Sequence, residues 1–262
     1  MSNKGEKLKI RVLGCSGGIA KGVATTSFLI DDDILIDAGT GVGELSIAEM
    51  KRIRHIFITH SHLDHVCSIA LLIDTLFDHL VGQPVTVHAQ RSTIKALKEH
   101  VFNWAIWPDF NVLPTKSNSV LKMKAMTKGG TLNIDGRSIE MIEVNHSVPG
   151  VAYRVESQGR SFAFSGDTTT NNTLWAALNK HDQLDLLFVE TAFANKDAEI
   201  ARLAFHYCPQ TLADDLVKLT HRPEVFITHL KPGEENRIMK ECQKALPDWK
   251  LQQLKSGDRF KL

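Results

Sequence analysis

Short apolar runs that end in a histidine or a carboxylate recur along this chain of 262 residues. The alternating segment Leu8–Leu13 predicts a first strand, and Thr25–Ile30 with Ile34–Ile36 predicts a hairpin around three consecutive aspartates. Apolar or alternating runs predict further strands at 56–58, 84–87, 121–127, 131–134, 137–144, 162–164, 186–190 and 225–228. Polar side chains that follow such runs are therefore expected at strand ends.

Helical periodicity fills most of the gaps between these strands, at 66–80, 171–178, 197–204, 210–219 and 234–246. The segment 91–118 is expected to be helical and then irregular, and it could overhang a site as a lid. Strands and helices alternate without a linker, which predicts one α/β domain over residues 1–262. The sequence Phe-Ile-Thr-His occurs at 57–60 and again at 226–229, which fits two similar β-rich halves that face each other.

Composition narrows the class of protein. A formal net charge of +1 provides no basic field that would recruit a nucleic-acid backbone. No apolar run approaches the roughly 18 residues that a membrane span requires, and segment 1–9 lacks the apolar core of a signal peptide. The four cysteines are scattered without metal-site or disulfide-framework spacing. We therefore expect reduced thiols and a cytoplasmic location.

The strongest chemical signal follows the strand at 56–58, where His60, His62, Asp64 and His65 fall within one short loop. His60 and His62, at i, i+2 spacing, can direct their side chains to one metal position on a non-helical backbone. Asp64 and His65 can supply ligands to a second position nearby. Imidazole and carboxylate are ligands of borderline divalent metals, zinc above all. Nearby Asp37 could be a ligand, but a structural role in support of this loop is favoured.

The stretch His-Ser-His-Leu-Asp-His resembles the His-x-His-x-Asp-His signature of the metallo-β-lactamase superfamily, whose fold is an αββα sandwich. The resemblance extends along the chain, because a later histidine, aspartate and final histidine occur in the expected order. It implies that His60, His62 and His146 bind a first metal ion. It further implies that a second ion binds to Asp64, His65 and His229, and that Asp167 bridges both ions.

Such an arrangement suits phosphodiester hydrolysis. Two divalent ions roughly 3.5–4 Å apart share a water, lower its pKa and hold the hydroxide in line with a phosphorus atom. An aspartate at the bridging position, Asp167, suits hard phosphate-type substrates. The histidine-rich donor set favours two Zn²⁺ ions, with Mn²⁺ or iron left open for one site.

Within the superfamily the chain is most similar to the class II cyclic-nucleotide phosphodiesterases. The similarity rests on residues 60–74, Glu-Thr-Ala-Phe-Ala-Asn at 190–195, and Ile-Thr-His-Leu-Lys-Pro at 227–232. It implies that His206 contacts the phosphoryl oxygen or protonates the leaving alkoxide, that Glu190 orients this imidazole, and that Asp64 belongs to the catalytic set. Where the family has His-Leu-Thr-Pro, this chain has His-Tyr-Cys-Pro at 206–209, which suggests an altered pocket wall.

The resemblance predicts an enzyme that opens cAMP or cGMP to the 5′-monophosphate. One alternative is a transfer-RNA 3′-processing endonuclease of the same superfamily, against which the near-zero net charge argues. Another is a sensor that binds a nucleotide without turnover, and a thioester or β-lactam hydrolase ranks lower still. The expected partner is a small cyclic nucleotide. Nucleic acid and membrane are not expected, and a homodimer is left open.

Overall fold

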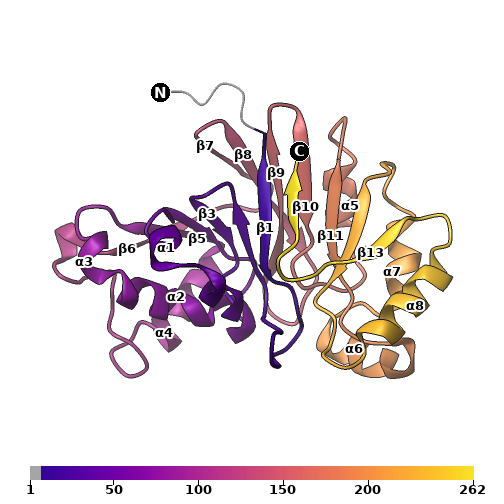
Figure 1. Cartoon of the computed structure of the whole chain (residues 1–262), viewed down its shortest axis with the longest axis horizontal. Coiled ribbons are helices and arrows are strands. Elements are labelled where there is room, and N and C mark those ends of the chain that lie inside the picture. Colours follow the sequence, from indigo (N-terminus) through magenta and orange to yellow (C-terminus); the bar gives the residue numbers. More distant parts are fainter. Residues whose placement is uncertain (1–6) are drawn as a thin grey trace.

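The computed structural model describes residues 7–262, which form two seven-stranded β-sheets packed face to face (Figure 1). Helices cover the outer face of each sheet, so the layers run helix, sheet, sheet, helix. This αββα sandwich confirms the fold class expected from the sequence. The sequence of segment 1–9 was interpreted as lacking a signal-peptide core. Residues 1–6 of this segment lie outside the described residues.

Both sheets are mixed, and each is built mainly from one half of the chain. The first sheet contains, in spatial order, β14 (Arg259–Lys261), β1 (Lys9–Gly14), β2 (Ser27–Ile30), β3 (Ile34–Ile36), β4 (His55–Phe57), β5 (Val85–Ala89) and β6 (Leu121–Ala125). The second contains β13 (Leu251–Gln253), β12 (Glu224–Thr228), β11 (Leu186–Glu190), β10 (Arg160–Phe164), β9 (Gly150–Ser157), β8 (Arg137–Val144) and β7 (Thr131–Ile134). The last strand, β14, returns to pair with β1, so the carboxyl end of the chain closes the first sheet.

The helices divide between the two outer faces. Those on the first sheet are α1 (Ile47–Met50), α2 (Leu63–Thr75), α3 (Phe77–Leu80) and α4 (Arg91–His100). Those on the second sheet are α5 (Thr173–Leu178), α6 (Ala198–Ala204), α7 (Pro209–Leu216) and α8 (Glu235–Ala245). Short 3-10 turns occur at Thr40–Glu44, Lys116–Asn118 and Asn195–Asp197.

Aromatic side chains fill the space between the sheets. Phe28 of the first sheet meets Phe164 of the second edge-on, with ring centroids 4.9 Å apart, and also contacts Phe188. Such pairs each add about 0.5–1.5 kcal/mol beyond the burial of their surface. This inner core holds the two sheets at a fixed separation, so groups on the edge of one sheet keep their distance from groups on the other.

The direction of the strands determines where the candidate functional side chains lie. Strands β3, β4 and β5 are parallel, as are β10, β11 and β12, so their carboxyl ends share one edge of each sheet. The repeated Phe-Ile-Thr-His at 57–60 and 226–229 ends β4 and β12. In both copies the phenylalanine packs between the sheets and the isoleucine faces the outer helices. Both histidines therefore leave the sheets at this shared edge, as the two-half interpretation anticipated.

Some element boundaries differ from the prediction. The helix expected at 66–80 begins at Leu63 and is interrupted at Leu76, which separates α2 from α3. Strand β9 was not predicted, because it is almost wholly buried and therefore shows no alternation of polar and apolar residues. Strands β13 and β14 have three residues each, too few for a periodic pattern.

Candidate metal centre

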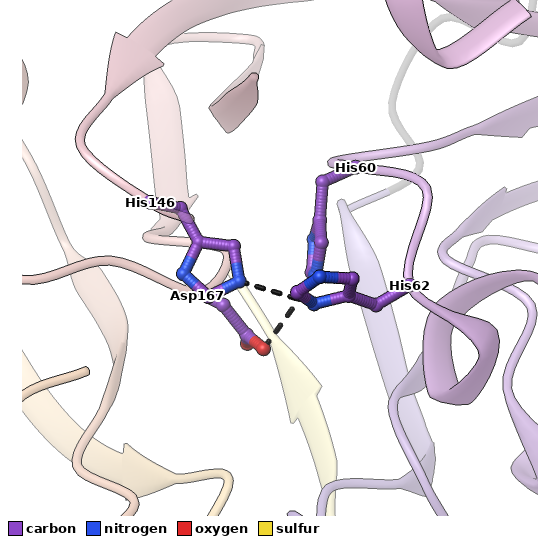
Figure 2. A group of neighbouring side chains, drawn as sticks. All are labelled: His60, His62, His146 and Asp167. Atoms are coloured by element: carbon purple, nitrogen blue, oxygen red, sulfur yellow. Dashed lines mark hydrogen bonds and ion pairs between the residues drawn. The ribbon is translucent and has the colours of Figure 1, made fainter. Parts of the chain in front are cut away.

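Donor atoms from four side chains converge at the open edge between the sheets (Figure 2). His60, His62, His146 and Asp167 each offer one ligand atom, and these atoms all lie within 4.8 Å of one another. His62 Nδ1 and His146 Nε2 are 3.2 Å apart, and His60 Nε2 lies 3.7 Å from Asp167 Oδ2. The structure therefore brings together the predicted first ligand group, with Asp167 included.

A second group shares the same aspartate. Asp64, His65, Asp167 and His229 also offer ligand atoms that lie within 4.8 Å of one another. Asp167 Oδ2 is 3.2 Å from His65 Nε2 and 3.3 Å from His229 Nε2. Asp64 Oδ2 lies 3.5 Å from His65 Nε2. All seven predicted donors are thus assembled, and Asp167 is the residue that belongs to both groups.

Local structure explains how these donors reach one place. His62 is the N-cap residue of α2, so Asp64 and His65 lie in the first helical turn. Asp167 follows Gly166, whose φ of +60° is in the left-handed region. A Cβ at Gly166 would lie 2.5 Å from the carbonyl oxygen of Val151, so only glycine fits there. The turn that delivers the shared carboxylate depends on this residue.

Hydrogen bonds to the outer ring nitrogens orient two of the imidazoles. Asp37 is fully buried, and its carboxylate accepts the Nδ1–H of His65 at 2.7 Å and the hydroxyl of Thr59 at 2.8 Å. The Thr59 hydroxyl in turn lies 3.0 Å from His60 Nδ1. These contacts assign the Nδ1–H tautomer to both histidines and direct each Nε2 lone pair into the site. Asp37 thus supports the histidine loop, as expected, and does not belong to either donor group.

His146 is held in the same way by a backbone group. Its Nδ1 lies 2.9 Å from the carbonyl oxygen of Phe205, which leaves Nε2 to face His62. Phe205 adopts a left-handed conformation at φ +59°, and this turns its carbonyl toward the site at the end of α6. A backbone carbonyl has no signature in sequence, so the role of Phe205 could not be predicted.

Burial sets the protonation state of most of these imidazoles. It lowers the pKa of His60 well below its usual value, that of His146 to about 4, and that of His229 to about 3. Burial acts in the same direction on His65, but the carboxylates of Asp167 and Asp37 outweigh it and raise its pKa well above the usual value. Burial thus favours neutral imidazoles at His60, His146 and His229, whereas two carboxylates favour positive charge at His65.

Several inner atoms of the site lack a hydrogen-bond partner within residues 7–262. His60 Nε2, His65 Nε2 and Asp167 Oδ1 are buried and make no hydrogen bond there. Buried polar atoms without partners are costly and call for an explanation. Nitrogen and oxygen donors that converge from five histidines and two aspartates fit divalent cations of the zinc type. The residues present therefore fit a metal pair.

A buried carboxylate–histidine pair lies beside the metal ligands. Glu190, at the end of β11, accepts the Nδ1–H of His206 at 2.9 Å and the backbone N–H of Thr168 at 3.0 Å. Burial lowers the pKa of His206, but the Glu190 charge and hydrogen bond outweigh it, so the pKa stands above its usual value. The His206 ring stacks on that of His229, with centroids 5.4 Å apart and planes at 14°. The predicted pair is therefore assembled next to the second donor group.

Tyr207 and Cys208, the two residues that depart from the family pattern, are buried behind the site and do not line its wall. Tyr207 and Cys208 have exposed fractions of 0% and 1%, and both side chains are buried. The Tyr207 hydroxyl donates to Asp215 Oδ2 at 2.7 Å. The expectation that these two residues alter the pocket wall is therefore wrong. They anchor the turn that carries His206 to α7.

Residues 32–245 match the family model of the β-lactamase superfamily domain. This chain belongs to the metallo-β-lactamase superfamily. A probable 3′,5′-cyclic-nucleotide phosphodiesterase of Yersinia pestis is 26% identical over 86% of this chain and 78% of its own length. The crystal structure of unliganded yeast PDE1 superposes with a TM-score of 0.84 at 17% identity, and covers 98% of this chain and 100% of that one.

Ribonuclease Z enzymes also resemble this chain in sequence. Ribonuclease Z of Pyrococcus abyssi is 27% identical over 53% of this chain and 43% of its own length. The match to the Yersinia phosphodiesterase extends over considerably more of both chains. The similarity to cyclic-nucleotide phosphodiesterases that the motifs indicated is thereby confirmed, and with it a metal-dependent hydrolase family.

Another histidine pair and the segment 91–118 lie outside the two donor groups. His88 is on β5, and its Nε2 lies 3.0 Å from Nδ1 of His55. The His88 ring stacks on Phe57 between the sheets. In the segment 91–118, which the sequence left open as a lid, Trp107 packs against the outer core whereas Trp104 is 64% exposed.

Proposed function

We propose that the chain is a dinuclear metal-dependent phosphodiesterase that hydrolyses 3′,5′-cyclic nucleotides to 5′-monophosphates. The observation that carries the proposal is the position of Asp167, whose carboxylate belongs to both donor groups. A shared carboxylate can hold two ions at the separation that in-line displacement at phosphorus requires. His60, His62 and His146 would hold one ion, and Asp64, His65 and His229 the other.

Two bound Zn²⁺ ions, or one with Mn²⁺ or iron, would lower the pKa of a water and neutralise charge on phosphoryl oxygens. The chain's own residues provide the remaining requirements. Because Glu190 accepts the Nδ1–H of His206, the Nε2 atom is the nitrogen that can act on the substrate. Protonated His206 would deliver a proton to the departing 3′ oxygen, and its raised pKa favours the protonated form near neutral pH.

The similarity to a named cyclic-nucleotide phosphodiesterase over 86% of the chain supports this substrate class. The sequence similarity to ribonuclease Z of Pyrococcus abyssi covers about half of the chain, and the formal net charge of +1 offers little attraction for an RNA backbone. The complete donor set argues against a sensor that binds nucleotide without turnover.

A substrate panel tests the proposal. Metal-defined protein should be assayed side by side on cAMP, cGMP, a bis-nitrophenyl phosphodiester and precursor transfer RNA. We expect turnover of a cyclic nucleotide with a 5′-monophosphate as the product, and slower turnover of the aryl diester. Cleavage of precursor transfer RNA without turnover of either cyclic nucleotide would replace this proposal with the RNA-processing alternative.

We also propose a small cyclic nucleotide as the physiological partner, a homodimer as the assembly, and a cytoplasmic location. The four cysteines are all unpaired, which is compatible with a reducing compartment. Within residues 7–262 no helix combines the length and apolar character needed to span a bilayer. Sedimentation at equilibrium would test the dimer, which a monomeric mass across the concentration range would contradict.

A further inference from the structure

Lys231 follows the ligand His229 by two residues and is half-buried beside the site. Its backbone N–H donates to the carbonyl oxygen of Ala192 at 3.2 Å, which fixes the chain just after β12. Its Nζ donates to the carbonyl oxygen of Gly17 at 3.0 Å. Main chain and side chain are thus both held, so the ammonium group has a defined position.

The contacts of this ammonium group are all neutral. Besides the Gly17 carbonyl, Nζ lies 5.5 Å from the centroid of the Phe193 ring, within the range of a cation–π contact. Within residues 7–262 no carboxylate lies within ion-pair distance of Lys231. Two other lysines differ in this respect. The partly buried Lys218 pairs with Asp215 at 2.6 Å, and the exposed Lys196 pairs with Glu234 at 2.7 Å. The positive charge of Lys231 is therefore not compensated within that range.

Both neutral partners of Lys231 also touch the site. The Phe193 ring lies 5.7 Å from that of His206. Gly17 packs so closely on His229 that a Cβ there would lie 2.5 Å from the His229 carbonyl oxygen and 3.0 Å from Cδ2. The charge of Lys231 is also close enough to His206 to oppose its protonation. The cation therefore lies on the His206 and His229 side of the metal centre.

We propose that Lys231 forms a phosphate-binding subsite, in which its ammonium group contacts a non-bridging oxygen of the substrate and of the 5′-monophosphate product. The proposal rests on the proposed function, because it names the group that this site recognises. A lysine serves as a point charge for phosphate, and an ordered, uncompensated one needs no rearrangement to bind an anion. A monophosphate product carries more negative charge than a cyclic diester, so the subsite favours the product.

A tether for the turn at residues 14–22 is the structural alternative for Lys231, because its Nζ holds Gly17 against His229. The two roles predict different responses to ligand charge. Loss of a tether would disturb His229 and weaken every ligand and the metal together. Loss of an anion subsite would weaken phosphate and leave a neutral nucleoside unaffected.

Calorimetric titration of metal-loaded protein with inorganic phosphate, and separately with neutral adenosine, distinguishes these roles. Lys231→Met keeps the length of the apolar stem and removes the charge, whereas Lys231→Arg keeps the charge. Lys180→Met is the matched control, because Lys180 is an exposed lysine on a different segment. Metal content is measured on every variant by elemental analysis.

We expect Lys231→Met to weaken phosphate binding by about 10- to 100-fold, the usual effect of losing a hydrogen bond to a charged group. Metal content and adenosine binding should be unchanged, Lys231→Arg should remain within about threefold of wild type, and Lys180→Met should have no effect. Phosphate affinity equal to wild type in Lys231→Met would overturn the proposal, and so would a parallel loss of metal. Inorganic phosphate is common to all phosphoester chemistry, so failure of the cyclic-nucleotide assay would leave this result interpretable.

Discussion

Glu190 Oε1 lies 2.9 Å from His206 Nδ1 and also accepts the backbone N–H of Thr168, the residue after Asp167. One buried carboxylate oxygen therefore fixes both the imidazole beside the metal ligands and the turn that carries the shared ligand. Glu190 thus connects the His206 imidazole with the turn that carries Asp167, so experiments must separate an effect on proton transfer from an effect on metal binding.

Two substrates with different leaving groups can separate a role of His206 in proton transfer from a role in metal binding. His206→Ala should retain both metals and lower kcat on a cyclic nucleotide by roughly 10²–10⁴-fold, the usual contribution of a general acid. A nitrophenyl diester should suffer much less, because its leaving group needs no proton. Steady-state kinetics on the two substrates checks this, with His100→Ala, on the exposed end of α4, as the control. Equal losses on both substrates would point to phosphoryl-oxygen contact.

Gly166 offers a test of how the shared aspartate is positioned. Gly166→Ala should lose metal and activity, because its Cβ would lie 2.5 Å from the Val151 carbonyl oxygen at a φ of +60°. The control is Gly136→Ala, where φ is +83° and no heavy atom lies within 4 Å of the new Cβ. That variant should cost about 1 kcal/mol of stability from backbone strain alone. Full metal content in Gly166→Ala, measured by elemental analysis, would contradict this account.

The pair of His88 and His55 should make stability depend on pH. Burial lowers the pKa of His88 to about 4 and also lowers that of His55. The unfolded chain therefore binds more protons than the folded one below pH 6.5, and stability falls as the pH drops from 6.5 toward 4. His88→Gln, which keeps a polar atom near Nε2 but does not titrate, should reduce this loss by about 1–3 kcal/mol. Urea unfolding at pH 7 and pH 4.5 measures the difference, and parallel pH profiles would refute it.

Much of the centre was predictable because its residues follow apolar strands and occur in a recognisable order. The seven donors that the structure assembles are the seven proposed from sequence, although their binding of metal stays a prediction. The contacts that orient these donors were harder to predict from sequence. Asp37 could be anticipated from its position after β3, whereas the Phe205 carbonyl could not, because every residue has one.

The arrangement of strands was also only partly predictable. A period of two residues identifies a strand but does not assign it to a sheet. Strands β6 and β7 are neighbours in sequence, yet the structure places them at the edges of different sheets. Tyr207 was expected on the pocket wall because it departs from the family pattern, but its hydroxyl binds Asp215 in the outer core. Sequence showed that the residue was unusual and could not show which way it faced.

Asp167 should matter more to the metal pair than any terminal ligand. Asp167→Ala is expected to lose at least one ion and nearly all hydrolysis while it remains folded, because both donor groups use this carboxylate. Asp64→Ala removes a ligand from one group only and should retain the first ion. Metal content and circular dichroism of the two variants make the comparison. Full activity in Asp167→Ala would show that the bridge is wrongly assigned.

The central claim is a pair of ions held by two donor groups with one carboxylate in common. Its most direct test is to strip the chain of metal, add Zn²⁺ in steps, and measure both the metal bound per chain and phosphodiester hydrolysis in the same samples. The account predicts that hydrolysis rises mainly with the second equivalent and levels off at about two ions per chain. Full hydrolysis with one ion or fewer per chain would contradict it.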